Sequence, residues 1–190
     1  MSATEVRPNQ REHILDVALR LMSERGATGT SMRQLANACD LQVAAIYHYF
    51  PSKDALLAAV VAERQYGTRL EDPLPVDPGA PPADRLTEVF VRVFEGALEE
   101  QSIWRLLIGE AMRGESTVLP VGRELISLLE PAAVTWVGAA VPEVSNPEDL
   151  AQLVVGQLLT GFIRTVFEPD VPARTIALQV AAPLAALVSD

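Results

Sequence analysis

The chain is short of cysteine, histidine and aromatic residues. Its 190 residues include one cysteine, Cys39, and two histidines, and aromatic residues make up 5%. A single cysteine excludes a disulfide framework and indicates a reducing compartment. His13 and His48 supply little histidine-based acid–base chemistry, and we find no Gly-rich phosphate loop, metal-ligand spacing or nucleophile motif. We therefore expect no enzymatic activity, no cofactor and no bound metal.

Targeting and membrane segments are also missing from the pattern. The first eight residues are short and polar, unlike a signal peptide. The longest uncharged stretch, residues 175–189, contains Pro183 and falls short of the roughly 20 residues that a membrane span needs. Hydrophobic residues make up 49% of the chain, enough for a sizeable core. We expect a cytoplasmic protein that does not use the membrane as a partner.

Positive charge is scarce overall, but its shortage is uneven. The net charge is -10. Residues 1–66 hold seven Lys or Arg and seven Asp or Glu, whereas the remainder holds eight and eighteen. The acidity therefore belongs to the later part of the chain. A neutral N-terminal part could bind nucleic acid only through a few well-placed contacts, which a dimer would double.

The most informative stretch is residues 31–53, which predicts two short helices joined by a tight turn. Ser31 followed by Gln34 forms the pattern of a capping box. The first helix has an apolar stripe and ends near Asp40, since aspartate tolerates left-handed backbone. The stripe consists of Met32, Leu35, Ala36 and Cys39.

The second helix of the pair divides into two faces. One face holds Val43, Ile46, Tyr47 and Phe50, and the other holds Gln42, Ala45, His48 and Tyr49. So short a helix is unstable alone and must pack against neighbouring helices. One such neighbour is the helix predicted over residues 9–25, which has an apolar stripe and ends at Gly26. This arrangement predicts a helix-turn-helix, whose second helix enters the DNA major groove.

The stretch resembles the N-terminal DNA-binding domain of the tetracycline-repressor (TetR) family of bacterial regulators. The resemblance covers about residues 9–66 by motif and the rest by size and helical character. Three positions depart from the family pattern: Asp40 and Ala44 replace glycines, and Gln42 replaces a serine. The matching positions are Ser31, Leu35, Ala36, Cys39, Leu41, Ile46, Tyr47, Tyr49, Phe50 and Lys53.

The resemblance implies a set of DNA contacts. Tyr47, Lys53 and the backbone near Ser31 would contact phosphates. Gln42, Ala45 and His48 would face base edges, where glutamine suits adenine and a methyl group suits thymine. Gln42 could equally be a plain helix-start residue, and His48 a plain surface histidine. The complete set of candidate DNA-binding residues is Ser31, Arg33, Gln42, Val43, Ala44, Ala45, Tyr47, His48, Tyr49 and Lys53.

Lys53 and Arg33 each allow a second interpretation. Lys53 lies in the first turn of the next helix, where a positive charge opposes the helix dipole. Beside a recognition helix, such a lysine suggests a phosphate contact, although it could simply be solvated. Arg33 could likewise reach the DNA backbone or stay in solvent.

The rest of the chain predicts further helices, at 52–70, 84–100, 102–113, 119–140, 147–167 and 172–188. Five prolines within residues 71–83 forbid a continuous helix there. Pro131 and Pro183 should kink or split their helices. The helix over 147–167 is apolar almost all round, and Gly156 and Gly161 would let another backbone approach. With 172–188 it predicts a homodimer through a four-helix bundle, the alternative being an ordinary monomer core.

A small-molecule pocket is implied by the family resemblance for the helical region. Aromatic residues with helical spacing can be plain core, and Arg164 could pair with a glutamate instead of a ligand. Glu110 and Arg113 are further polar residues on apolar helices. The pocket candidates are Phe90, Phe94, Trp104, Arg105, Met112, Trp136, Gln157, Thr160, Phe162 and Arg164.

These observations predict an all-α protein of about nine helices. Residues 1–51 would form a three-helix DNA-binding domain and residues 52–190 a helical effector-binding and dimerisation domain. The predicted function is a ligand-responsive transcriptional regulator, by resemblance a repressor that an effector releases from a near-palindromic operator. The alternative is a helical protein-interaction module that has lost sequence-specific DNA binding. The lack of net charge in residues 1–66 and the negative charge of Asp40 favour this alternative.

Overall fold

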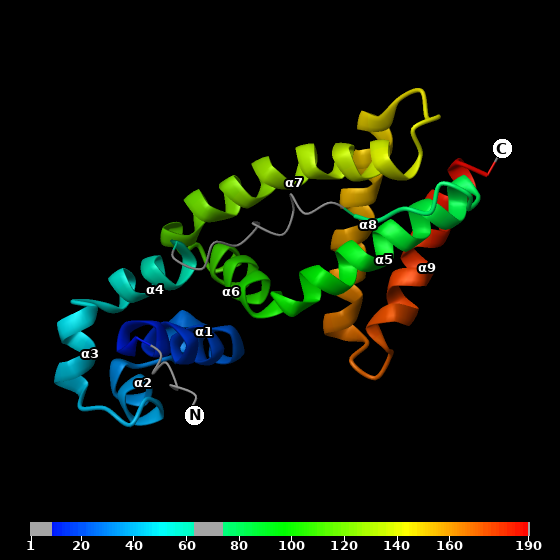
Figure 1. Cartoon of the computed structure of the whole chain (residues 1–190). Coiled ribbons are helices and arrows are strands. Elements are labelled where there is room, and N and C mark those ends of the chain that lie inside the picture. Colours follow the sequence, from blue (N-terminus) through cyan, green and yellow to red (C-terminus); the bar gives the residue numbers. More distant parts are fainter. Residues whose placement is uncertain (1–8, 63–73, 190) are drawn as a thin grey trace, which may run out of the picture. The chain divides into compact units, whose positions relative to one another are not determined.

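The computed structural model describes residues 9–62 and 74–189. Every regular element in those residues is helical (Figure 1). The all-α class is thereby confirmed. The helices are α1 (Gln10–Gly29), α2 (Met32–Ala38), α3 (Val43–Tyr49), α4 (Lys53–Ala62), α5 (Pro82–Glu99), α6 (Gln101–Met112), α7 (Leu119–Ala140), α8 (Pro147–Phe167) and α9 (Ala173–Leu187), with a 3-10 helix η2 (Ser116–Val118) before α7.

The predicted helices agree with these bounds to within about two residues at most ends. The exception is the helix expected over 52–70, of which Lys53–Ala62 is described and the remainder lies outside the described residues. Proline splits neither α7 nor α9, since Pro131 and Pro183 lie inside continuous helices. The predicted split was therefore wrong, whereas the predicted kink stays a prediction.

Contacts divide the chain into two compact units. The first comprises Met1–Gln65 and Gln101–Arg123, and the second comprises Tyr66–Glu100 and Glu124–Asp190. The first unit therefore includes α4 and α6 as well as the three N-terminal helices. The expected functional boundary after residue 51 stays a prediction.

The core of the first unit is built around α1. This helix buries its predicted stripe and packs against α2, α4 and α6. Ile14, Ala18 and Leu56 are fully buried there. The helical geometry of α1 breaks at Gly26, where φ is 76° and ψ is 158°. The predicted end of the helix is thus confirmed, and Ala27–Gly29 form a short continuation beyond the break.

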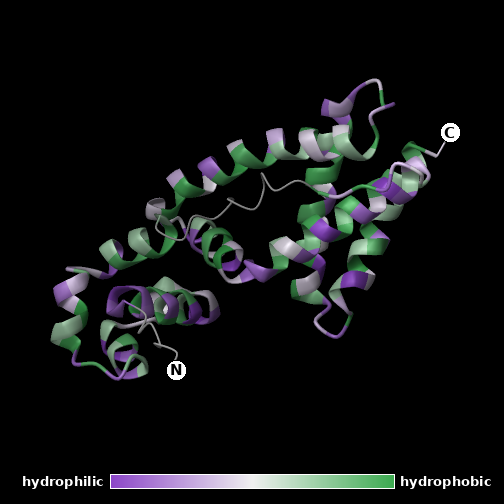
Figure 2. Ribbon diagram, viewed as in Figure 1, coloured by the Kyte–Doolittle hydropathy of each residue, from purple (hydrophilic) through white to green (hydrophobic). Residues whose placement is uncertain are grey.

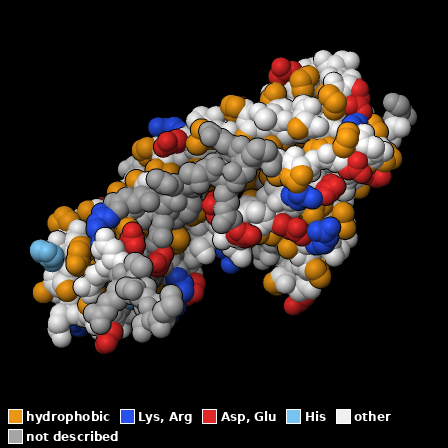
Figure 3. Space-filling view, in the orientation of Figure 1, with side chains coloured by type: hydrophobic (Ala, Val, Ile, Leu, Met, Phe, Trp, Pro, Cys, Tyr) orange, Lys and Arg blue, Asp and Glu red, His pale blue; other side chains and the backbone are white. Residues whose placement is uncertain are grey.

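The second unit is a bundle in which α5 packs against α8 and α9, and α8 and α9 lie side by side. Hydrophobic residues recur along both α8 and α9 (Figure 2). The core includes Phe90 and Phe94 of α5, Trp136 of α7 and Ile176 of α9. Figure 3 shows acidic and basic side chains next to one another on one face of the molecule. One ion pair joins Arg174 of α9 to Glu95 of α5, at 3.2 Å.

Helix α8 buries one side and exposes the other. Leu150, Ala151 and Val154 are buried, whereas five large apolar side chains are 44–80% exposed: Leu153, Leu159, Ile163, Val166 and Phe167. By length and composition alone α8 is apolar enough to cross a membrane, with a mean hydropathy of 1.4, a test that the core helix of a soluble protein also passes. The sequence analysis did not identify this helix because it counted only uninterrupted uncharged residues, and its expectation of no membrane partner stays a prediction.

Candidate nucleic-acid interface

The start of α2 is fixed by the predicted capping box. The Gln34 amide donates to Ser31 Oγ at 3.2 Å, and the Ser31 amide donates to Gln34 Oε1 at 2.8 Å. Reciprocal capping of this kind typically contributes about 0.5–2 kcal/mol to helix stability. Ser31 and Arg33 are both exposed, so the capped end of α2 is open to a partner.

The turn between α2 and α3 depends on Asp40. Its φ is 55°, the one positive φ at a non-glycine residue in the described part of the chain. The Leu41 amide donates to the Ala36 carbonyl at 2.9 Å, which closes the end of α2 as a glycine-type cap does. Asp40 therefore adopts the left-handed turn conformation that the sequence analysis predicted for it.

Helix α3 is held by a few apolar contacts. Ile46 and Phe50 are buried, and the Arg11 guanidinium lies 4.9 Å from the centre of the Phe50 ring. A cation–π contact of this kind contributes about 0.5–2 kcal/mol. This contact joins the end of α3 to α1 and leaves the opposite face of α3 accessible.

The candidate contact residues on α3 are mostly accessible. Gln42, Ala44 and His48 are exposed, and Tyr47 is 49% exposed despite its apolar-face assignment. The side chains of Val43, Ala45 and Tyr49 are half-buried. The His48 ring meets the Tyr49 ring edge-on, with centroids 5.4 Å apart. The exposed surface of α3 therefore carries hydrogen-bonding groups suited to phosphates and base edges.

Lys53 lies beside the start of α2 and is the chain's one lysine. Its ammonium Nζ donates to the carbonyls of Thr28 and Thr30, each at 3.3 Å. An ammonium has three donors, so one remains for a further acceptor. Because Thr30 directly precedes Ser31, the structure brings Lys53 and the capped end of α2 together.

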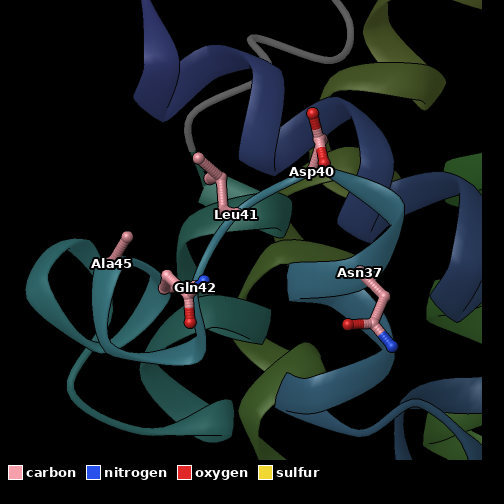
Figure 4. A pocket seen from close by; sticks show the side chains of 5 residues that line it. All are labelled: Asn37, Asp40, Leu41, Gln42 and Ala45. Atoms are coloured by element: carbon pink, nitrogen blue, oxygen red, sulfur yellow. The ribbon is translucent and has the colours of Figure 1, made fainter.

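An open hollow of about 600 Å³ lies at the helix-turn-helix itself. Figure 4 shows the five lining side chains around the turn: Asn37, Asp40, Leu41, Gln42 and Ala45. Two of them, Gln42 and Ala45, were candidates from the sequence. Asn37 was not among them, because exposed polar residues near a helix end carry no distinctive pattern.

The candidate ligand-pocket residues belong to both compact units, and the pocket itself stays a prediction. Trp104, Arg105 and Met112 belong to α6 in the first unit, and Met112 is 84% exposed. The remaining candidates belong to the second unit, where three are core residues less than 6% exposed and the others range from half-buried to exposed: Phe90, Phe94, Trp136, Gln157, Thr160, Phe162 and Arg164.

Two polar pocket candidates in the second unit have partners of their own. The Arg164 guanidinium donates to both Glu168 oxygens, at 2.8 and 2.7 Å, and to Gln179 Oε1 at 2.8 Å. The hydrogen bond from Arg164 lowers the pKa of the Glu168 carboxyl. Thr160 Oγ1 donates to the Gly156 carbonyl within its own helix. Arg164 therefore pairs with a glutamate, one of the two possibilities that the sequence left open. Among the described residues, no group of His, Cys, Asp or Glu side chains could hold a metal ion.

The fold and the site define a helix-turn-helix protein with a separate helical unit. Residues 14–60 match the family model described as bacterial regulatory proteins, tetR family. Residues 14–60 therefore belong to this family by sequence.

Several known proteins are similar to this chain. The HTH-type transcriptional regulator AcrR of Shigella flexneri is 34% identical over 93 residues, which are 48% of this chain and 43% of AcrR. The chain therefore matches less than half the length of that relative. Salmonella enterica GusR has a TM-score of 0.68 at 24% identity, covering 98% of both chains. Bacillus subtilis FadR, solved with stearoyl-CoA, has a TM-score of 0.61 at 15% identity, covering 94% of this chain and 97% of FadR.

Proposed function

We propose that this chain is a sequence-specific DNA-binding transcriptional regulator, acting as a repressor in the cytoplasm. The observation that carries the proposal is the helix-turn-helix surface, on which Gln42, Tyr47 and His48 are exposed and the half-buried Lys53 lies nearby. The match of residues 14–60 to the tetR family model supports the proposal. The proposal assigns the chain no catalytic reaction.

The proposed roles follow from the chemistry of each side chain. Tyr47 and Lys53 would contact phosphates, which position the protein without reading sequence. Gln42 and His48 would face base edges, and Ala45 would offer its methyl group to a thymine. Because residues 1–66 have no net charge, affinity would depend on these few contacts and on their duplication in a dimer.

A second copy of the chain is the proposed partner for the exposed side of α8. Five large apolar residues on one helix form a surface that water disfavours, and such patches mark interaction sites. A homodimer through α8 and α9 would bury this surface and place two recognition helices for a near-palindromic operator.

A small-molecule effector is the third proposed component. FadR, which shares the fold, was solved with stearoyl-CoA. We propose that the helical unit of this chain binds an effector that shifts the protein away from its DNA-binding conformation. Stearoyl-CoA is a first probe, and operator affinity with and without it is the measurement. Unchanged affinity with every compound in a broad panel would count against ligand control.

The test of DNA binding uses the purified chain and a duplex that it selects from a random pool. Fluorescence anisotropy over a series of salt concentrations gives the affinity and its salt slope. Lys53→Ala should weaken binding and lower the salt slope by about 0.9, the contribution of one phosphate neutralised by a cation. Tyr47→Phe should weaken binding and leave the slope unchanged, because the lost hydroxyl carries no charge. Arg92→Ala, on α5, serves as the charge-matched control and should leave both unchanged.

The same experiment separates the alternative function, a protein-interaction module that no longer reads DNA. The neutral N-terminal part and Asp40 favour this alternative. Under it, no duplex is enriched from the random pool, and neither substitution changes anything on DNA. Under the proposal, DNA binding collapses in a Tyr47→Phe/Lys53→Ala double variant while the dimer persists.

A further inference from the structure

Glu110 is a buried carboxylate that the DNA-binding surface does not use. Its side chain is 2% exposed, and its Oε1 accepts from the Ala27 amide and from the Arg113 guanidinium, each at 2.8 Å. Glu110 and Ala27 lie 83 residues apart in the sequence and belong to the same compact unit. A carboxylate this deeply buried needs partners, and here one of them is the backbone of α1.

The backbone break at Gly26 creates the need for that contact. With φ at 76° and ψ at 158°, the residue adopts a conformation that is essentially restricted to glycine. A Cβ atom at this position would stand 3.1 Å from Glu110 Oε1 and 3.2 Å from an Arg113 nitrogen. The break interrupts the helical ladder, and the Ala27 amide takes the carboxylate as its acceptor.

The turn beyond the break leads directly to Lys53. Thr30 is 2% exposed and its Oγ1 donates to the Gly26 carbonyl at 3.0 Å. The Thr30 amide donates to the Ala27 carbonyl at 3.2 Å, and the Thr30 carbonyl accepts from Lys53 Nζ at 3.3 Å. A continuous chain of hydrogen bonds and short backbone segments therefore joins Glu110 to the ammonium of Lys53.

Glu110 is itself fixed to the end of α6. Gly114, with φ at 83°, closes this helix, and the Glu115 amide donates to the Glu110 carbonyl at 3.0 Å. The Glu115 carboxylate then accepts from the Thr117 amide and hydroxyl at the start of η2. The position of the Glu110 carboxylate is therefore tied to the position of α6, which follows α5 after a single residue.

We propose that Glu110, assisted by Arg113, is a positioning residue that holds the Gly26–Thr30 turn and thereby sets the Lys53 ammonium for DNA. The claim that Glu110 positions Lys53 is the first half of the inference; it rests on the hydrogen bonds alone and is measured separately. The claim that this positioning serves DNA binding is the second half, and it rests on the proposed function.

The first measurement uses the fact that Lys53 is the one lysine in the chain. An amine-reactive reagent labels Lys53, and peptide mass spectrometry separates this label from that on the N-terminal amine. Glu110→Gln keeps an acceptor for Ala27 but loses the charge that holds Arg113. We expect Lys53 to react roughly two- to tenfold faster in this variant, because local opening is more populated. Glu88→Gln, at an exposed ion pair with Arg92, should react like the wild type.

The second measurement is operator affinity over a series of salt concentrations. Glu110→Gln should weaken binding by about 2- to 30-fold, the range for substitutions that alter coupling between sites. It should also lower the salt slope by about 0.9, as loss of one phosphate contact does. In a Lys53→Ala background, Glu110→Gln should cause little further loss. A role in folding alone would reduce the active fraction without changing the slope.

The outcomes separate the two claims. Faster Lys53 labelling together with a lower salt slope supports the inference. Unchanged labelling and an unchanged slope in Glu110→Gln, in a wild type that binds DNA, overturn the inference and leave the proposed function standing. A wild type that selects no duplex overturns the proposed function and the second half of the inference. Should Glu110→Gln not fold, Arg113→Gln at the 55% exposed end of the pair carries the same test, with smaller shifts in the same directions.

Discussion

Two exposed helical surfaces of this protein differ sharply in chemistry. On α3 the accessible side chains include Gln42, Tyr47 and His48, all of which can form hydrogen bonds. On α8 they include Leu159 and Ile163, which are 52% and 48% exposed and can form none. A polar surface stays soluble and binds a polar partner, whereas an apolar one is stabilised only by covering it. The difference agrees with the two proposed partners, DNA for α3 and a second copy of the chain for α8.

The charges of the two regions reinforce this difference. Residues 1–66 are neutral, whereas the remainder carries the whole net charge of -10. Acidic residues outside the DNA-binding part keep the protein soluble and disfavour non-specific attachment of that part to DNA. Specific binding would then come from geometry more than from bulk charge.

Charging the exposed surface of α8 should have the largest effect. A symmetric interface contains each residue twice, so Leu159→Glu/Ile163→Glu removes four apolar side chains from it. Each is about half exposed in the single chain, so dimerisation would bury the other half and contribute about half of the usual 1.5–3 kcal/mol per buried side chain. The dimer should weaken by about 3–6 kcal/mol by this reasoning. Sedimentation velocity should show a single chain of 20.5 kDa in place of twice that mass.

The control for this prediction adds the same two charges elsewhere. Ala58→Glu/Ala62→Glu modifies exposed positions of α4 and should remain dimeric. If the α8 variant sediments as the wild type does, the dimer does not use this surface, and the proposed role of α8 in dimerisation is contradicted.

The two glycines of α8 provide a medium-sized test within one helix. A Cβ at Gly161 would stand 2.6 Å from Phe94 Cε2, whereas a Cβ at Gly156 meets nothing within 4 Å. Gly161→Ala should destabilise the fold by about 1–3 kcal/mol through overpacking. Gly156→Ala should stabilise the helix by about 0.5–1 kcal/mol.

Thermal unfolding in the Leu159→Glu/Ile163→Glu background measures both glycine variants without a contribution from dimerisation. Shifts of opposite sign are the expected result. Equal shifts would show that the Phe94 ring does not occupy the space beside Gly161.

The smallest effect concerns Cys39, which is buried on α2. Burial raises the pKa of its thiol above the usual value, opposed by the nearby Arg20 charge. The folded protein therefore holds this proton to higher pH than the unfolded chain does. The stability that it contributes is present below the unfolded pKa and falls as pH rises above it. A thiol reagent at pH 8 should label the native protein far more slowly than the urea-unfolded chain, and equal rates would contradict the burial.

Much of this architecture could be predicted because its signals are local. The capping box at Ser31, the break at Gly26 and the left-handed turn at Asp40 each depend on residues a few positions apart. Helix bounds followed from apolar periodicity for the same reason. The second apolar side of α8 could also be predicted from the sequence, because a helix that is apolar all round must be covered on more than one side.

The rest depends on contacts between distant residues, which no local pattern records. The hydrogen bond from the Ala27 amide to Glu110 joins residues 83 positions apart. Gly161 was expected to accommodate another backbone, but the ring of Phe94 lies against it. The division of the pocket candidates between two compact units also follows from long-range contacts. Helical spacing identifies faces and cannot say which faces meet.

The most direct test of the account is competition between a selected duplex and scrambled DNA. Purified protein is titrated onto the labelled duplex, and anisotropy is followed with a large excess of scrambled competitor. The account predicts saturable binding that survives the competitor, with two chains bound per near-palindromic site. Binding that the competitor abolishes would contradict it, because the surface of α3 would then contact DNA without reading its sequence.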